Sequence, residues 1–80
     1  MISKITEEEI KELLSRNLDI QELVVSDLKG GDHWQIDISA RDFNGLNTMK
    51  KHRVIYKILA EPLASGAIHA LVINVQESLI

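Results

Sequence analysis

A strict alternation of side chains in the middle of the chain is the feature that most constrains the fold. From Trp34 to Arg41, apolar residues occupy every second position and polar residues occupy the positions between them. This period of two is typical of a β-strand with one buried and one wet face. The segment Lys29–Asp32 before it contains two glycines and favours a turn, because glycine adopts positive φ at little cost. Leu23–Asp27, rich in branched residues, precedes that turn, so the sequence predicts a β-hairpin.

A first helix is predicted over Glu7–Arg16, ahead of the hairpin. Thr6 and Glu9 have the spacing of a capping box, and the glutamates of the first turn complement the positive end of the helix. Asn17 is expected to end the helix as a left-handed cap. The apolar stripe of this helix consists of Ile10, Leu13 and Leu14.

A second helix is predicted after a loop at residues 42–45, with Asn47 or Thr48 as its N-cap. Arg53 lies on the expected apolar side of this helix, which makes it the best candidate for a structural arginine folded inward. That side comprises Met49, Arg53, Tyr56 and Leu59, and it is widened by Val54 and Ile58.

Pro62 divides the remaining helical region. It must end or kink the second helix, or open a short third helix in its first turn, because proline has no N–H to donate. Gly66 is expected to close this third piece. Ala70–Val75 is apolar on both faces and predicts a last strand, packed against helices on one side and partly enclosed. The order αββααβ predicts an α+β domain, in which helices pack on one face of a small three-stranded sheet.

Length and composition narrow the function. The 80 residues are expected to form one domain over 1–80, and no apolar run approaches the roughly 20 residues that span a bilayer. The chain has no cysteine, so it can form no disulfide and can offer no thiolate to a metal. Its net charge of -3 argues against a protein that coats nucleic acid by charge alone. Since the N-terminus lacks the layout of a secretory signal, a cytoplasmic location is expected.

Three motifs give the chain a family resemblance. Phe43–Gly45 reads Phe-Asn-Gly, Lys50–Tyr56 reads Lys-Lys-His-Arg-Val-Ile-Tyr, and Ile68–Leu71 reads Ile-His-Ala-Leu. With these motifs at this spacing, the chain resembles the BolA family over nearly its whole length. It departs from the family after the last strand, where members usually carry a Thr-Pro-Glu-Glu-Trp-like segment and this chain has Gln76–Ile80.

The resemblance implies a fold related to the type II KH domain. It also implies partnership with monothiol glutaredoxins in iron–sulfur cluster binding and iron signalling. The expected protein is a non-catalytic adaptor that shares a [2Fe–2S] cluster with glutaredoxin and glutathione and holds no cofactor when isolated. Some members are described as DNA-binding regulators of stress response and cell shape, which is the alternative function. A homodimer of the free protein is left open.

His69 lies at the start of the predicted last strand. Read from the residues alone, a single histidine in an apolar run is more often a core histidine whose ring nitrogens are satisfied by backbone. The resemblance reverses this reading, because the histidine of Ile-His-Ala-Leu is the cluster ligand of the family. Neutral imidazole is a suitable ligand for iron.

His33 lies on the predicted hairpin and would otherwise be read as a polar turn residue. The resemblance is to the subtype with histidine in this loop, which makes His33 the second metal ligand. A hairpin loop next to the last strand could bring His33 beside His69. Two histidines do not complete a cluster, so the thiolates must come from a glutaredoxin cysteine and glutathione. Two histidines on one iron also raise the potential of a [2Fe–2S] centre.

A basic patch is predicted on the second helix. It consists of Lys50, Lys51, His52, Arg53 and Lys57. The patch is either a solvated helix face, a docking surface for glutaredoxin and its acidic glutathione, or a set of phosphate contacts to nucleic acid. His52 is not expected to bind metal, because Thr48 and Tyr56, four residues away on either side, are poor ligands.

The rival functions have less support in the sequence. KH domains hold nucleic acid with a Gly-x-x-Gly loop, and Gly45 has no partner glycine at that spacing. Trp34 could stack on a base, but its alternation with Ile36 and Ile38 favours the core. No nucleophile–base pair or phosphate-binding glycine loop is found, so an enzyme is not expected. An interaction module without metal remains the third reading.

Overall fold

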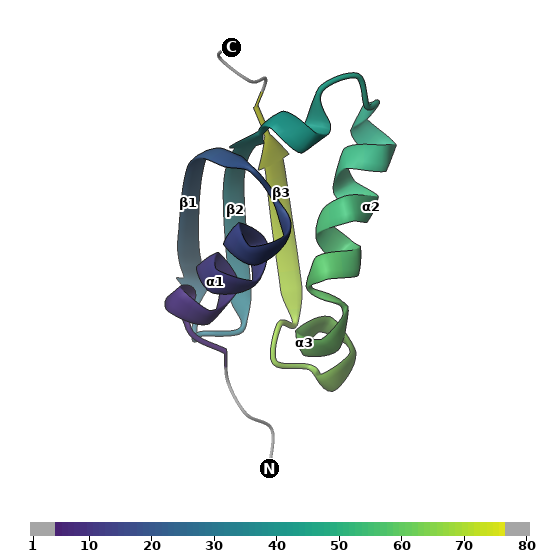
Figure 1. Ribbon diagram of the computed structural model, residues 1–80. Helices are drawn as coiled ribbons and strands as arrows, with labels where there is room; N and C mark the ends of the chain where they lie inside the picture. The colour runs from purple at the N-terminus through teal and green to yellow at the C-terminus, as the bar shows by residue number, and fades with distance from the viewer. Residues whose placement is uncertain (1–4, 77–80) are drawn as a thin grey trace.

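The computed structural model describes residues 5–76, which fold as three helices beside a sheet (Figure 1). The elements are α1 (Glu7–Asn17), β1 (Ile20–Lys29), β2 (His33–Ala40), the 3-10 helix η1 (Arg41–Phe43), α2 (Thr48–Ile58), α3 (Ala60–Ser65) and β3 (Ala70–Val75). The predicted order αββααβ is confirmed. The added element is η1, which forms where a plain loop was expected, and it carries the buried ring of Phe43.

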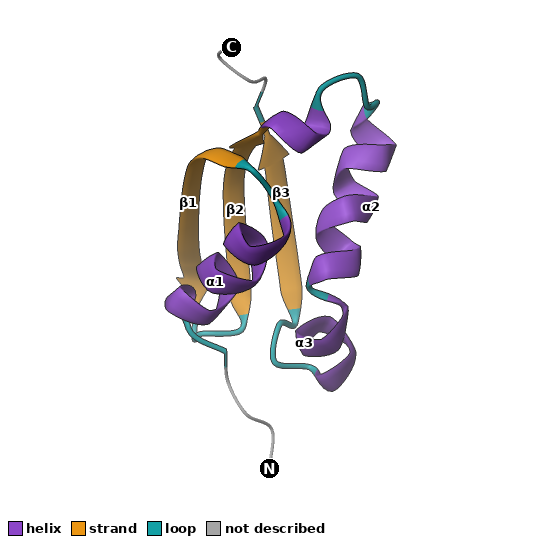
Figure 2. Cartoon of the chain, viewed as in Figure 1, coloured by secondary structure: helices purple, strands orange, loops and turns teal. Residues whose placement is uncertain are grey.

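The sheet has the strand order β1-β2-β3, with β3 at one edge (Figure 2). The predicted hairpin is confirmed, because β1 and β2 pair antiparallel from Ile20 opposite Ala40 to Lys29 opposite His33. β1 is longer than the predicted Leu23–Asp27, since hydrogen bonding to β2 extends a strand beyond its branched residues. β3 pairs with β2 in parallel, so the two helices α2 and α3 form the crossover between them.

One face of the sheet carries the core. Trp34, Ile36 and Ile38 point into it from β2, as their alternation predicts, and Trp34 is a core residue with 4% of its surface exposed. The helices cover this face, and α1 crosses it in Figure 1. The other face is open, because Val24 and Val72 are 56% and 46% exposed. The expectation that β3 is partly enclosed therefore holds for its core face only.

The N-terminal end of α1 agrees with prediction, and its C-terminal end differs from it. The Thr6 hydroxyl accepts a hydrogen bond from the backbone N–H of Glu9 at 3.2 Å, which is the expected N-cap. The left-handed cap at Asn17 was wrong, since no described residue other than glycine has positive φ. Instead, the Asn17 side-chain amide donates to the carbonyl of Leu13 at 2.8 Å and the chain leaves the helix extended.

The orientation of α2 differs from the predicted one. Its N-cap is Asn47, whose side chain accepts from the N–H of Lys50 at 2.9 Å. Its buried side is formed by Ile55 together with Leu59, whereas Met49, Arg53 and Tyr56 are exposed. The predicted apolar side was therefore wrong for Met49, Arg53 and Tyr56, and so was the inward-folded arginine. It is confirmed for Leu59, which is buried, and for Val54 and Ile58, which pack partly buried against the core. Residues four apart share a helix face, so Ile55 and Leu59 form the stripe that packs on the sheet.

The C-terminal half of the crossover follows prediction. Pro62 is the third residue of α3, in the first turn, where a helix leaves N–H groups unpaired in any case. Gly66 closes α3 in the left-handed conformation with φ of 84°. The departure from the family pattern at the C-terminus falls mostly on residues 77–80, which lie outside the described residues. Among residues 5–76, no helix has the length and apolar character needed to cross a membrane.

Candidate functional site

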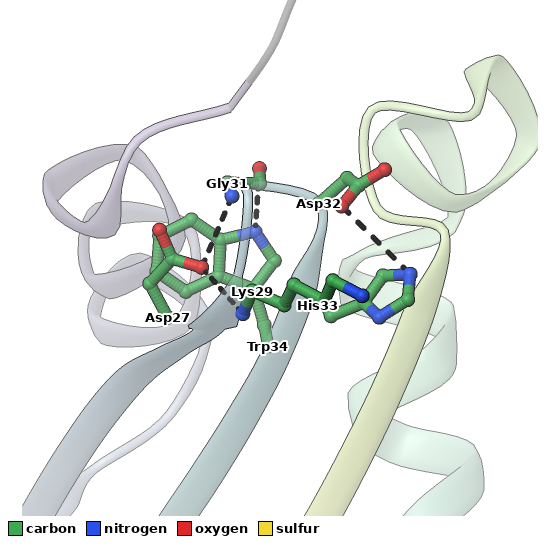
Figure 3. A network of polar contacts seen from close by, with 6 residues as sticks. All are labelled: Asp27, Lys29, Gly31, Asp32, His33 and Trp34. Atoms are coloured by element: carbon green, nitrogen blue, oxygen red, sulfur yellow. Dashed lines mark hydrogen bonds and ion pairs between the residues drawn. The ribbon is translucent and has the colours of Figure 1, made fainter.

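The turn between β1 and β2 is held by a network of hydrogen bonds (Figure 3). The Asp27 carboxylate accepts from the N–H groups of Lys29 and Gly31 at 3.1 and 3.0 Å. Gly30 and Gly31 both have positive φ, 69° and 80°, as the glycine pair predicts. The indole N–H of Trp34 donates to the carbonyl of Gly31 at 3.1 Å. The turn is therefore fastened to the core through Trp34, directly beside the first residue of β2.

A second set of bonds ties the start of β3 to this turn. The carbonyl of Asp32 accepts from the N–H of His69 at 2.7 Å and from the N–H of Ala70 at 3.2 Å. In the parallel ladder, His33 pairs with Ala70. Since His69 immediately precedes Ala70, these bonds bring the two histidines together although they are far apart in the sequence.

The imidazole rings of His33 and His69 are stacked. Their centroids lie 5.5 Å apart and their planes differ by 12°. Neither ring is buried in the core, because His69 is exposed and the side chain of His33 is 36% exposed. The hairpin loop thus brings His33 beside His69, as expected, and an approaching molecule can reach both rings.

Two charged residues of the turn flank the ring of His33. A carboxylate oxygen of Asp32, Oδ1, lies 3.8 Å from His33 Nε2. Lys29 is the cross-strand partner of His33, and in Figure 3 its side chain extends alongside that of His33. Neither residue is among the site residues predicted from the sequence. The signal was present, since an aspartate precedes His33 in the chain and a short hairpin places Lys29 opposite it.

The donor set at this place is incomplete for a metal. In the part of the chain that the structure describes, no group of three or more histidine, cysteine, aspartate or glutamate side chains could hold a metal ion. Two accessible imidazoles supply half of a tetrahedral ligand set. Two imidazoles would fit a metal or cluster that a second molecule also binds, because residues 5–76 do not bring together the further ligands that a metal site needs. The ligand role of His33 and His69 stays a prediction.

The basic residues of α2 form a separate surface along that helix. Lys50, Arg53 and Lys57 are exposed, and Lys51 and His52 are half-buried. None of the ion pairs between residues 5 and 76 involves α2. Met49 and Tyr56 are exposed on the same helix, so this surface combines cations with apolar groups.

A pocket of about 350 Å³ lies elsewhere, between α1 and α3. Its lining is mainly apolar and includes Glu9 and Glu61. It contains none of the predicted site residues. The histidine pair is thus a surface site and is not the floor of this pocket.

These observations define a small α+β domain of the αββααβ order, with an exposed histidine pair where the hairpin meets the last strand. Residues 14–78 match the family described as BolA-like protein. The chain belongs to this family, as its motifs predict.

Curated relatives agree with this assignment. The chain is 35% identical over 66 residues to the acid stress protein IbaG of Escherichia coli, covering 82% of this chain and 76% of that protein. It is 33% identical over 76 residues to the chloroplastic BOLA1 of Arabidopsis thaliana, covering 78% of this chain. The match spans only 47% of the length of that chloroplastic relative.

Solved structures share the fold. BolA1 from Arabidopsis thaliana superposes with a TM-score of 0.80 at 32% identity, covering 88% of each chain. The BolA domain of SufE1 from the same plant superposes with a TM-score of 0.81 at 33% identity, covering 91% of this chain and 94% of that one. The α+β fold predicted from the sequence is therefore the fold of BolA structures.

Proposed function

We propose that this protein is a non-catalytic adaptor that pairs with a monothiol glutaredoxin and shares a [2Fe–2S] cluster with it. His69 and His33 are the ligands from this chain. The observation that carries the proposal is the pair of adjacent, accessible imidazoles, 5.5 Å apart between centroids, in a described region with no group of three or more side chains that could hold a metal ion.

The chemistry of the donors supports a shared site. The chain has no cysteine, so thiolate ligands must come from the partner's cysteine and from glutathione. Histidine on iron raises the potential of a [2Fe–2S] centre, which is what this ligand set would contribute. The backbone bonds from His69 and Ala70 to Asp32 hold the two rings near each other before any partner arrives. This arrangement reduces the ordering required when the partner binds.

The surface of α2 supports docking of an acidic partner. Lys50, Arg53 and Lys57 are exposed and outside the ion pairs that the described residues make. Such cations speed association with an acidic protein and orient it. We therefore assign partner binding to the predicted patch of Lys50, Lys51, His52, Arg53 and Lys57.

The second candidate function is DNA binding in a stress regulator. Exposed Tyr56 among the cations of α2 favours it, because an aromatic ring next to basic side chains can contact a nucleic acid. The net charge of -3 and the missing Gly-x-x-Gly loop count against it. A gel shift whose affinity falls steeply with salt would support this candidate.

Co-expression with a monothiol glutaredoxin tests the leading proposal. The expected result is a coloured complex with visible absorption that contains both chains, whereas this protein purified alone is colourless. Spectroscopy sensitive to histidine nitrogen on iron should then detect nitrogen ligands. If the co-purified complex forms and remains colourless, the protein is an interaction module without metal.

A further inference from the structure

The carboxylate beside His33 has no role in the function proposed above. Asp32 Oδ1 lies 3.8 Å from Nε2 of His33, the ring nitrogen farther from the backbone (Figure 3). Both side chains are partly exposed, at 45% for Asp32 and 36% for His33. The contact therefore sits at the surface where a partner would meet the ring.

We propose that Asp32 is a positioning residue that biases the tautomer of His33 toward the form with the ring N–H on Nε2, in which Nδ1 is bare. The tautomer is a property of the free protein. That the bare Nδ1 is the nitrogen offered to metal rests on the proposed function.

The chemistry of the groups near the ring determines where its proton lies. A neutral imidazole carries one N–H and one bare nitrogen. A carboxylate can only accept a hydrogen bond, and an ammonium can only donate one. The carboxylate of Asp32 lies 3.8 Å from Nε2, and its negative charge attracts the positively polarised hydrogen of a ring N–H. The N–H is thus favoured on the nitrogen that faces Asp32, which is Nε2.

The size of this effect follows from the distance. A separation of 3.8 Å exceeds the roughly 3.2 Å limit of an N–H···O hydrogen bond, so the carboxylate acts as a nearby charge. A unit charge at this range still biases the position of a proton, although solvent weakens the bias at an exposed site. The inference therefore predicts a shifted tautomer ratio and does not require one tautomer alone.

The position of Asp32 is maintained by the backbone. Its carbonyl accepts the two N–H groups at the start of β3, from His69 at 2.7 Å and Ala70 at 3.2 Å. The turn before it is held by the Asp27 carboxylate. Because none of these bonds uses the Asp32 side chain, a change of that side chain leaves them in place. Metal-binding histidines commonly give their other N–H to a carboxylate or carbonyl, which orients the ring.

The test is nitrogen NMR on the free, metal-free protein labelled with ¹⁵N at histidine. Spectra are recorded at a pH above which the ring nitrogen shifts no longer change, so that they report neutral rings. We expect His33 to be mainly the Nε2–H tautomer in the unmodified chain. In Asp32→Ala the ratio of Nε2–H to Nδ1–H should fall at least about twofold, a change of about 0.4 kcal/mol. Asp32→Glu should restore part of the ratio.

His52 on α2 is the internal control, because its ratio should stay constant in the same spectra. An unchanged His33 ratio in Asp32→Ala would overturn the inference, as would a predominant Nδ1–H form in the unmodified chain. Loss of the fold would appear as collapse of the amide spectrum, and Asp32→Asn then provides a near-isosteric variant with the charge removed. Cluster binding is measured separately, by co-expression of His33→Ala with glutaredoxin. If His33→Ala leaves the cluster spectrum unchanged, the ligand role of His33 fails while the tautomer result stands.

Discussion

At the scale of single residues, the two histidines are held by different backbone contacts. The N–H of His69 is bonded to the Asp32 carbonyl at 2.7 Å, and His69 is exposed at the start of β3. His33 is the first residue of β2 and adjoins a turn containing two glycines. Both rings are accessible. The family motif Ile-His-Ala-Leu contains His69, so the proposed ligand role is better supported for His69 than for His33.

Replacement of either histidine tests this ranking. His69→Ala should abolish the shared cluster or weaken it well beyond the roughly 10–100-fold lost when a residue supporting a ligand is removed. His33→Ala should have a smaller effect, seen as an altered visible spectrum or faster cluster loss. Absorption of the co-purified complex measures both.

His52→Ala is the matched control for these two variants, since it removes an imidazole that lies on α2 and is not part of the histidine pair. It should leave the cluster spectrum as it was. If His69→Ala gives the same spectrum as the unmodified complex, His69 is not a ligand.

At the scale of elements, α2 shows why a residue pattern can mislead. Met49, Arg53 and Tyr56 recur at helical spacing, and so do Ile55 and Leu59. The sheet buries the second set, because branched and aliphatic side chains fill its surface without leaving a charge or a hydroxyl unsolvated. The first set is left in solvent, where it forms the mixed basic and apolar surface of α2.

A pair of alanine substitutions measures this orientation. Ile55→Ala should lower the free energy of unfolding by about 2–5 kcal/mol, because it opens a cavity in the core. Met49→Ala should change it by at most about 0.5 kcal/mol, because the side chain is 65% exposed. Urea denaturation followed by circular dichroism provides both values. Equal costs for the two variants would contradict the buried face described above.

At the scale of the whole molecule, the charges are unevenly distributed. The first turn of α1 holds Glu7, Glu8 and Glu9, whereas α2 has no acidic residue in its first turn. Cations of α1 are engaged locally, as in the ion pair of Lys11 with Glu7 at 2.9 Å. A partner with an acidic surface is therefore attracted to α2 and repelled by the start of α1.

Charge reversal on α2 tests whether its cations attract the partner. The double variant Lys50→Glu with Lys51→Glu should weaken glutaredoxin binding about tenfold, or about 1.4 kcal/mol. The deficit should shrink as salt rises above about 0.15 M, because screening shortens the Debye length below about 8 Å. Titration calorimetry at two salt concentrations measures both effects.

Reversal of Lys11 and Arg16 on α1 changes the net charge by the same amount and serves as the control. It should leave the affinity nearly unchanged, because Lys11 and Arg16 lie on α1, outside the proposed docking surface, and already pair with Glu7 and Glu12. Equal weakening by both double variants would show that only net charge matters. If the Lys50→Glu, Lys51→Glu variant binds glutaredoxin with unchanged affinity, Lys50 and Lys51 belong to an ordinary solvated helix face.

The order of helices and strands, the hairpin and the buried face of β2 can all be predicted from the sequence. These depend on local preferences such as the glycine turn, the Thr6 cap and the alternation from Trp34, which act between near neighbours. The lack of cysteine also established that any shared cluster must take its thiolates from another molecule. Which face of α2 packs on the sheet and where β3 pairs depend on contacts between segments far apart in the chain, and no local pattern encodes contacts made across a crossover. The parallel pairing of β3 with β2 stacks His69 on His33, whereas Asp32 lies beside the ring because it directly precedes His33 in the chain.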